Sequence, residues 1–392
     1  MQTIIPATGR EAPAATRRAA GLADGVERPP DGLLALARGI LLRGSLRGDP
    51  VAAEGDLIFT TAATGWGEIL TDPSYAGQIV VLTHPMAGSY RIADDELESA
   101  RVHARALVCT RLVTPPPGPG RALEDVLVEA GIPAVTGVDT RALTLELRSG
   151  GERRAVVLPA GPSDDEAVRA AREVAAWEAV DHVAGVATRR PYTVAPTGQR
   201  RARATLVDYG VKRSLLAALA GRGLEIIVLP HDASAADVSA TGADLVVLSP
   251  GPGDPSRMEP QIATVDELAR TAASGGTPVL GVCLGHQLLA LAAGAETRRL
   301  AVGHHGGNHA VLEAVTGRVD IGAHNHEVEV VDGPALIAAG YAVSHRDLND
   351  GTVEGLVHAS GRIASVQFHP EGAPGPTDAT RVFDLAIAAA LV

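Results

Sequence analysis

The chain has few aromatic residues and few methionines. Aromatic residues make up 3% of its 392 residues, and there are 3 methionines. Apolar residues nevertheless reach 46%, so each core must be built from Ala, Val, Leu and Ile. A chain of this length is expected to form about two domains, each able to bury a sizeable core.

The sequence also lacks a disulfide framework and a membrane span. Its 2 cysteines, Cys109 and Cys283, lie far apart, which suits a reducing compartment and a cytoplasmic location. No run of 18 uninterrupted apolar residues occurs, so no transmembrane helix is expected. The start of the chain has no apolar centre of a secretory signal, and 1–31 is interpreted as a disordered tail. A net charge of −12 argues against a nucleic-acid or anionic-membrane partner.

The first half of the chain mixes strands and helices without regular alternation. The expected strands are 32–45, 56–61, 78–83 and 105–113, and the expected helices are 123–130 and 140–148. We predict a mixed α/β domain over 32–160. A helix over 164–178 and a stretch containing Pro, Gly and Arg over 189–203 follow, so 161–203 is interpreted as a helix and linker.

After this linker, strand and helix alternate at roughly 20–35 residues per unit, the pattern of a doubly wound, mostly parallel sheet. The expected strands are 204–208, 225–230, 244–249 and 278–282, and the expected helices are 212–221, 234–241, 261–274 and 288–293. We therefore predict an α/β protein whose second domain covers 204–392. Functional residues in such sheets lie at the carboxyl ends of the strands.

A strand-to-helix turn at Gly281-Val282-Cys283-Leu284-Gly285 has the form of a nucleophile elbow with Cys in the place of Ser. Glycines on both sides are needed because the turn is tight. The turn places the Cys283 sulfur at a helix N-terminus, which favours the reactive thiolate. The N–H of Leu284 would face a tetrahedral oxyanion. A small buried cysteine in a turn is the alternative.

A nucleophilic cysteine needs a base and a group that orients it. His369 follows an expected strand over 364–368, and Glu371 lies two residues further on, beyond Pro370. A carboxylate there could hold the imidazole in one tautomer and stabilise its charged form. The alternative is a loop histidine near a surface glutamate, but together with the elbow these residues favour a Cys-His-Glu triad.

Two further segments carry candidate binding residues. In the loop Ser249-Pro250-Gly251-Pro252-Gly253-Asp254-Pro255, the glycines let backbone N–H groups approach a substrate, and one could complete an oxyanion hole. Five histidines then occur close together, His304, His305, His309, His324 and His326. Glycines interrupt them and no cysteine joins them, so we expect no metal site. Asn325 is a candidate contact for a substrate amide.

These motifs resemble those of the class I glutamine amidotransferases, through GVCLGHQLLA, SPGPGDP and HPEG. Further segments, TGWGEILTDPSY from Thr64, DYGVKRSLL from Asp208, GHHGGNH from Gly303 and PEGAPGP from Pro370, are similar to the small subunit of carbamoyl phosphate synthetase. The resemblance runs from about Gly32 to the C-terminus. It implies a flavodoxin-like amidotransferase domain preceded by the amino-terminal domain of that family.

The resemblance implies a glutaminase in which Cys283 attacks glutamine, His369 transfers the proton and Glu371 orients His369. Ammonia would pass to a large subunit that uses bicarbonate and ATP with Mg²⁺ to make carbamoyl phosphate, for pyrimidine or arginine biosynthesis, in a heterodimer. No GxxxxGK[ST] loop occurs in this sequence, consistent with ATP chemistry elsewhere and with no cofactor in this chain. The family's glutamine contacts correspond here to Ala62, Gly251, Gly253, Leu284, Gln287, Asn325, Glu327 and Val328.

Some of these positions depart from the family pattern. Ala62 stands where the family has a serine that helps to bind glutamine, and Glu327 and Val328 stand where it has glycine and an aromatic residue. The lost hydroxyl and the added carboxylate would weaken glutamine binding. Three hypotheses follow: a glutaminase subunit of carbamoyl phosphate synthetase, an amidotransferase that serves a different synthetase, and a catalytically weakened binding module.

Overall fold

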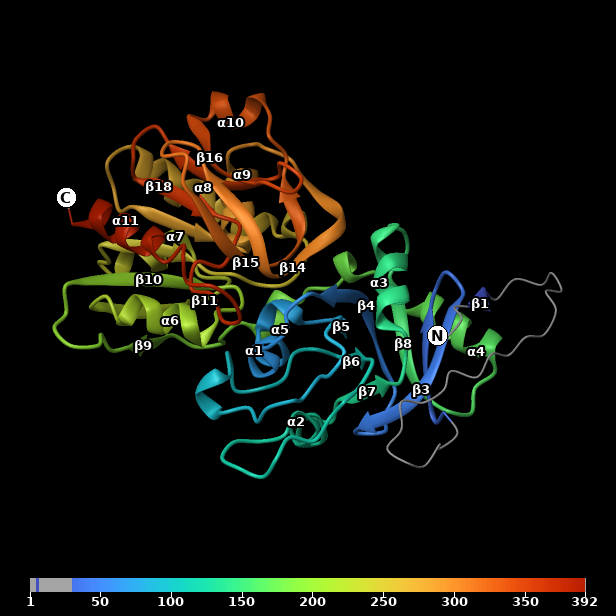
Figure 1. Ribbon diagram of the computed structural model, residues 1–392. Coiled ribbons are helices and arrows are strands. Elements are labelled where there is room, and N and C mark those ends of the chain that lie inside the picture. The colour runs from blue at the N-terminus through green and yellow to red at the C-terminus, as the bar shows by residue number, and fades with distance from the viewer. Residues whose placement is uncertain (1–4, 7–29, 392) are drawn as a thin grey trace. The chain divides into compact units, whose positions relative to one another are not determined.

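The computed structural model describes residues 5–6 and 30–391. It divides into two compact units, one of Met1–Thr71 and Tyr75–Val180 and the other of Asp72–Ser74 and Asp181–Val392 (Figure 1). The tail predicted over 1–31 lies almost entirely outside the described residues. The predicted linker region, 161–203, is shared between the two units.

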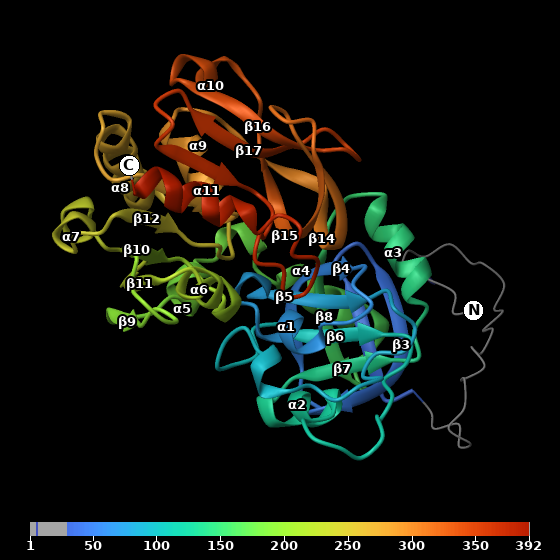
Figure 2. The same cartoon turned by 60° about the vertical axis from the view of Figure 1, so that its left-hand side comes forward.

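The N-terminal unit is built on an 8-stranded sheet in the order β1-β3-β2-β8-β4-β5-β6-β7, in which β3 also pairs with β7. This extra pairing closes the sheet into a barrel, and Figure 2 shows the curvature of its strands. The strands are β1 (Ile5–Pro6), β2 (Gly32–Leu36), β3 (Ile40–Gly48), β4 (Ala53–Thr60), β5 (Gln78–Leu82), β6 (Ala106–Cys109), β7 (Pro133–Thr136) and β8 (Arg154–Pro159).

Short helices cover this barrel, namely α1 (Trp66–Thr71), α2 (Leu123–Ala130), α3 (Thr140–Arg148) and α4 (Asp164–Glu173). α2 ends where expected because Gly131 adopts a left-handed conformation at φ 68°. α3 adds Leu143 and Leu147 to the barrel core. Its N-terminus is capped by Asp139, which accepts from the Ala142 N–H.

Two predictions for this unit were wrong in detail. The single strand expected over 32–45 is a hairpin of β2 and β3, since Gly39 turns the chain at φ 92°. The helix expected over 164–178 ends at Glu173, because the backbone of Val174 leaves the helical region at φ −58° and ψ 133°. β7 and β8 were not predicted.

The C-terminal unit contains a 10-stranded sheet in the order β15-β14-β16-β17-β18-β13-β12-β10-β11-β9. Its central strands run parallel, as predicted: β10 (Ala202–Asp208), β11 (Leu224–Pro230), β12 (Leu245–Leu248), β13 (Val279–Val282) and β18 (Ile363–Val366). Of these, β18 pairs with antiparallel β17, and β11 pairs with antiparallel β9 (Tyr192–Val194). The α/β fold class is confirmed.

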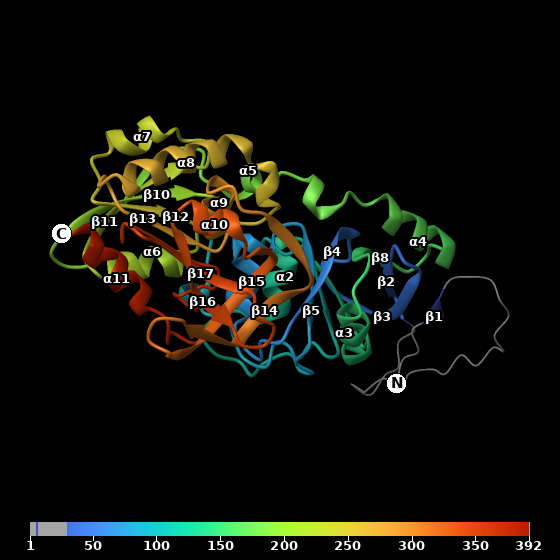
Figure 3. The same cartoon turned by 90° about the horizontal axis from the view of Figure 1, so that it is seen from above.

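Helices cover both faces of these parallel strands. α7 (Ala235–Ala240), α8 (Glu259–Ala273) and α9 (Leu284–Ala292) pack into one hydrophobic cluster, and α6 (Arg213–Ala220) and α11 (Arg381–Ala390) into another. Figure 3 shows α7 and α8 on one side of the central strands and α6 and α11 on the other. A short helix, α5 (Val183–Val186), lies near the start of the unit.

The antiparallel part of this sheet was not predicted. It consists of β14 (Thr297–Glu313), β15 (Val319–Val330), β16 (Tyr341–Asp347) and β17 (Val353–His358), with α10 (Pro334–Ala338) between β15 and β16. β15 also pairs with β17, at Val330 and Val353, so these strands close on themselves. Polar residues and glycines dominate β14 and β15. The alternation of apolar and polar residues that indicates a half-buried strand is therefore absent, and these strands could not be recognised in the sequence.

Within the described residues, no helix is both long enough and apolar enough to cross a membrane. The longest helix described, α8, has 15 residues.

The central strands are held by aliphatic packing, so truncation in β13 should destabilise the C-terminal unit. Leu280 is 0% exposed, whereas Leu385 on α11 is 60% exposed. Leu280→Ala should lower the free energy of unfolding by about 2–5 kcal/mol because it leaves a cavity, and Leu385→Ala should change it by less than about 1 kcal/mol. Urea denaturation followed by circular dichroism measures both; equal effects would contradict the assigned core.

Candidate active site

Cys283 occupies a strained turn between β13 and α9. Its backbone lies at φ 53° and ψ −104°, a region that non-glycine residues rarely adopt and that marks functional turns. The helix begins at Leu284, earlier than the expected 288, so the sulfur sits directly at its N-terminus. A Cβ at Gly281 would lie 2.7 Å from the Gly285 carbonyl oxygen, and one at Gly285 would lie 2.3 Å from that of Leu248. The predicted elbow and the need for both glycines are therefore explained sterically.

His369 and Glu371 lie in a turn after β18, which ends at Val366 rather than at the predicted 368. The His369 N–H donates to the Ala323 carbonyl at 2.8 Å, which ties this turn to β15. The ring Nδ1 lies 2.9 Å from Glu371 Oε1. His369 Nε2 has no hydrogen-bond partner among the described residues. Glu371 thus holds the ring through Nδ1 and leaves Nε2 available.

The electrostatics of this pair favour a charged imidazole. Burial alone would lower the pKa of His369, but the Glu371 carboxylate, with a further contribution from Cys283, raises that pKa to about 10. Burial alone would raise the pKa of Glu371, but Lys212 and His369 lower it to about 2. The Cys283 sulfur, the imidazole and the carboxylate therefore form one interacting set of buried groups.

Lys212 also contacts the candidate triad, although no motif in the sequence predicts it. Its Nζ lies 3.3 Å from Glu371 Oε1 and donates to the Gly372 carbonyl at 2.8 Å, with its side chain 2% exposed. The charge holds Glu371 ionised and fixes the turn that carries His369. One feature of the sequence could have pointed to this residue: Lys212 is the only lysine among the 34 Lys and Arg residues of the sequence.

Two further groups contact the Cys283 sulfur. Gln367 Nε2 donates toward Sγ at 3.6 Å, and the thiol faces the Asn325 carbonyl at 4.0 Å. Gln367 is fully buried and was not predicted, because its role depends on the packing of β18 against the elbow. These contacts fix the direction in which the sulfur points.

The predicted glycine loop lies directly beside the elbow. The Gly285 N–H donates to the Ser249 carbonyl at 3.2 Å, which joins α9 to the end of β12. A Cβ at Gly251 would lie 2.3 Å from the Tyr209 carbonyl oxygen and 3.0 Å from Leu284 Cδ2. Gly253 adopts φ 105°, which only glycine adopts readily. The two segments predicted to supply oxyanion donors, around Gly251 and Leu284, are therefore adjacent.

The other predicted glutamine contacts are divided between the two units: Gln287 and Asn325 belong to the C-terminal unit and Ala62 to the N-terminal unit. Gln287 is buried in α9, and its Nε2 donates to the Val328 carbonyl at 2.8 Å and to Gln367 Oε1 at 3.1 Å. Asn325 Oδ1 lies 2.9 Å from His305 Nδ1. Ala62 belongs to the N-terminal unit, where its N–H donates to Thr60 Oγ1 at 3.2 Å.

The carboxylate of Glu327, which the sequence analysis treated as an added charge, is paired. Its Oε1 lies 2.7 Å from His305 Nε2, and its Oε2 lies 3.6 Å from Arg299 Nε. Glu327 is 3% exposed. A buried carboxylate with two such partners exerts less repulsion on a ligand than an unpaired one would.

The elbow cysteine and the His369–Glu371 pair lie on a doubly wound sheet, and the sequence of this unit is that of a class I glutamine amidotransferase. The sequence pattern of the family "Glutamine amidotransferase class-I" matches residues 205–389, and that of "Carbamoyl-phosphate synthase small chain, CPSase domain" matches residues 34–157. The chain belongs to the carbamoyl phosphate synthase small chain family, whose members are the glutamine-hydrolysing chains of that synthase.

Similar proteins cover nearly the whole chain. The carbamoyl phosphate synthase small chain of Methanopyrus kandleri is 41% identical over 357 residues, 90% of this chain and 96% of its own length. The "pyrimidine-specific small chain" of Halalkalibacterium halodurans is 38% identical, over 90% of this chain and 94% of its own. A solved structure of a glutamine amidotransferase from Thermotoga maritima covers 44% of this chain and 77% of its own, at 17% identity and a TM-score of 0.34.

The Glu371 carboxylate should determine how stability depends on pH. Because the pKa of His369 is raised to about 10 in the folded chain, its stabilising contribution is complete below pH 6.5 and is lost as the pH rises through about 10. Glu371→Gln removes the group that raises this pKa. The variant should therefore lose less stability than the wild type between pH 6.5 and 10, as measured by urea denaturation at each pH.

The exposed carboxylate Glu267 on α8 provides a matched control for this comparison. Glu267→Gln should keep the wild-type pH dependence. Glu354 and Asp350 raise the pKa of His304 to about 9 against the effect of burial. His304 therefore adds the same pH dependence of stability to the wild type and to both variants, and this contribution cancels in the comparison. Parallel curves for Glu371→Gln and the wild type would show that the carboxylate does not hold the charge on His369.

Lys212→Met should destabilise the chain and make it more sensitive to acid. Removing one partner of a buried ion pair costs about 3–5 kcal/mol at neutral pH. In the wild type, Glu371 contributes stability that is present above pH 4.5 and lost as the pH falls through about 2; without Lys212 its pKa rises and the loss begins at higher pH. Arg270→Met, at an exposed ion pair with Asp266, should cost less than about 1 kcal/mol. Similar acid unfolding of the two variants would refute the assigned role of Lys212.

Proposed function

We propose that this chain hydrolyses glutamine through Cys283, His369 and Glu371 and delivers the ammonia to the large subunit of a carbamoyl phosphate synthase. The observation that carries the proposal is the strained backbone of Cys283 at a helix N-terminus, together with its electrostatic interaction with an imidazole that a buried carboxylate holds. Family membership supports the amidotransferase role. The triad and the transfer of ammonia are our assignments.

In the first half of the reaction, the Cys283 thiolate attacks the carbon of the glutamine side-chain amide. A carbon–sulfur bond forms, and the carbonyl oxygen becomes an oxyanion that accepts from backbone N–H groups of Leu284 and the Gly251 loop. The His369 imidazolium, stabilised by Glu371, donates its Nε2 proton to the amide nitrogen. The carbon–nitrogen bond breaks, ammonia leaves, and a glutamyl thioester remains on Cys283.

In the second half, neutral His369 takes a proton from water. The resulting hydroxide attacks the thioester carbon, the carbon–sulfur bond breaks, and glutamate leaves. The thiolate and the imidazolium are restored. Lys212 keeps Glu371 ionised throughout the cycle, so that the imidazole can alternate between its two charge states without losing its orientation.

The proposed partner follows from the name of the family. A small chain implies a large one, and we assign bicarbonate and ATP with Mg²⁺ to that large subunit in a heterodimer. The glutaminase steps themselves require no cofactor. Since one of the similar proteins is named pyrimidine-specific, we assign the product to pyrimidine biosynthesis, with arginine biosynthesis as the alternative use of carbamoyl phosphate.

Replacing the nucleophile tests this proposal. Cys283→Ser should reduce glutamine hydrolysis by at least about a thousandfold, whereas Cys109→Ser should not, because Cys109 is fully buried in the other unit. Ammonia release is measured with and without the large chain of a carbamoyl phosphate synthase, and wild-type activity should rise when that chain is added. The same pair should form carbamoyl phosphate from glutamine.

Two outcomes would contradict the proposal. Activity that needs Cys283 but ignores the large chain would favour an amidotransferase serving a different synthetase. A folded chain that neither hydrolyses glutamine nor reacts at Cys283 with a glutamine-like affinity label would favour a binding module. Ala62→Ser would then be the first substitution to test for a gain of activity.

A further inference from the structure

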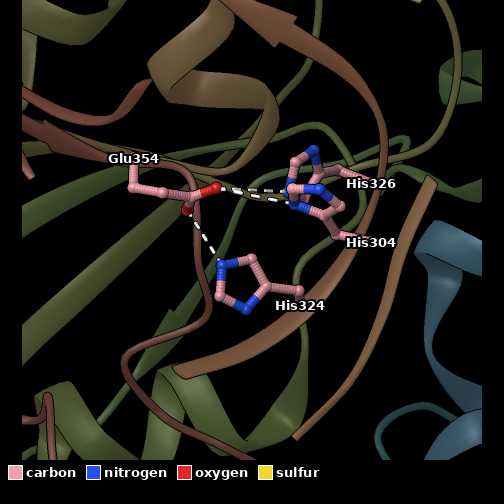
Figure 4. A group of neighbouring side chains, drawn as sticks. All are labelled: His304, His324, His326 and Glu354. Carbon is pink, nitrogen blue, oxygen red and sulfur yellow. Dashed lines mark hydrogen bonds and ion pairs between the residues drawn. The ribbon is translucent and has the colours of Figure 1, made fainter. Parts of the chain in front are cut away.

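A cluster of buried ligand-type side chains lies between strands of the antiparallel part of the C-terminal sheet. His304 comes from β14, His324 and His326 from β15, and Glu354 from β17. Their side chains are between 0% and 8% exposed. Figure 4 shows the three imidazoles arranged around the Glu354 carboxylate. The glutaminase mechanism uses none of these four side chains.

Three polar atoms of this cluster are buried without a hydrogen-bond partner among the described residues. They are His304 Nδ1, His326 Nε2 and Glu354 Oε1. Both nitrogens lie 3.7 Å from Glu354 Oε1, too far for a hydrogen bond. A buried polar atom without a partner costs about 1–3 kcal/mol. Three such atoms facing one point indicate that a further group belongs between them.

The opposite nitrogens of the same rings are held by acceptors. His326 Nδ1 donates to the Val328 carbonyl at 3.0 Å, and His324 Nδ1 lies 3.2 Å from the Gly322 carbonyl. His304 Nε2 lies 2.8 Å from Asp350 Oδ2. In a neutral imidazole, a ring nitrogen that donates to a carbonyl or carboxylate leaves the lone pair on the other nitrogen. This outer arrangement is the one that orients histidine ligands of metal ions.

We propose that this cluster binds a divalent transition-metal ion of the zinc type. The ligands are His304 Nδ1, His326 Nε2 and Glu354 Oε1, and His324 Nε2, now 2.9 Å from Glu354 Oε2, completes the set. The four ligand atoms lie within 4.8 Å of one another. Tetrahedral ligands at about 2.1 Å from zinc are about 3.4 Å apart, near the 3.7 Å that separates Glu354 Oε1 from His304 Nδ1 and from His326 Nε2. Imidazole and carboxylate together suit zinc better than calcium or magnesium.

A neighbouring group shares two of these residues but fits an ion less well. His304, His309, His324 and Asp347 also approach one another. Within this second group, His309 Nδ1 already lies 2.7 Å from Asp347 Oδ2, and His309 is only half-buried. Among the described residues, neither His309 nor Asp347 has a buried atom without a partner. The first group is therefore the proposed site.

Four protein ligands and deep burial make this a structural rather than a catalytic site. The ion would join the β14–β15 hairpin to β17, which follows β15 only after α10 and β16. β15 carries Asn325, whose carbonyl faces the Cys283 sulfur, and Ala323, whose carbonyl accepts from the His369 N–H. Binding of the ion would thus position the strand that supports both nucleophile and base. This inference departs from the expectation of no metal.

The first test measures metal on the wild-type chain. The full chain, prepared without a histidine tag, is treated with a chelator, dialysed against Zn²⁺ or Co²⁺ and then against buffer, and analysed for bound metal. We expect about one ion per chain, visible Co²⁺ bands of four-coordinate geometry, and a higher melting temperature with Zn²⁺ than with chelator. A folded wild-type chain that retains no ion, and whose melting temperature the chelator does not change, would overturn the proposal.

Variants then locate the ion. Glu354→Gln and His326→Asn should lose the bound metal and the Co²⁺ bands. His358→Gln, on the same strand as Glu354 and bonded to Ser360, should retain both, and so should His309→Asn. Loss of metal from His309→Asn with retention in His326→Asn would assign the ion to the second group and overturn the proposal. Retention in all four variants would place the ion elsewhere and overturn it equally.

Discussion

The site depends on one steric constraint, the close approach of the β13–α9 turn to the end of β12. Gly285 packs against the Leu248 carbonyl with no room for a Cβ, and Gly281 packs against Gly285 in the same way. This approach forces Cys283 into a backbone conformation with a positive φ, and the conformation puts the sulfur at the helix N-terminus. The neighbouring loop around Gly251 can reach Leu284 only because the turn is so compact. Relaxing any of these contacts would move the nucleophile away from His369.

Buried charge is the second organising feature of the C-terminal unit. Lys212, Glu371 and His369 alternate in sign along one line of contacts, so each charge is offset by a neighbour. The cluster around Glu354 has the same kind of composition but leaves three polar atoms without partners among the described residues. An apolar core of Ala, Val and Leu makes unpaired charge expensive. In the first cluster the charges are offset by one another, and His369 Nε2, which has no partner among the described residues, is the atom that the proposed reaction uses. In the second cluster we assign the unpartnered atoms to an ion.

Much of the central fold could be predicted because its signals are local. The parallel strands of the second half are short apolar runs, and helices such as α6 and α7 were predicted to within a residue at each end. β14 and β15 could not be predicted because histidine, glycine and asparagine hide their alternation, and they pair with each other over a long hairpin. The closure of the N-terminal barrel escaped prediction for a related reason: the pairing of β3 with β7 joins residues far apart in the chain.

The proposed nucleophile, base and orienting carboxylate could be predicted from the sequence by itself, because the Gly-x-Cys-x-Gly turn and the spacing of His369 and Glu371 are local patterns with a steric or electrostatic reason. It also determined the doubly wound sheet, through its alternation of strand and helix. Only the tertiary structure decided which buried groups complete the site. Lys212, Gln367 and the partners of Glu327 come from distant segments, and their contacts exist only once β10, β18 and β15 are packed around the elbow. The convergence of His304, His326 and Glu354 was decided in the same way, since strand pairing brings together residues that no sequence spacing connects.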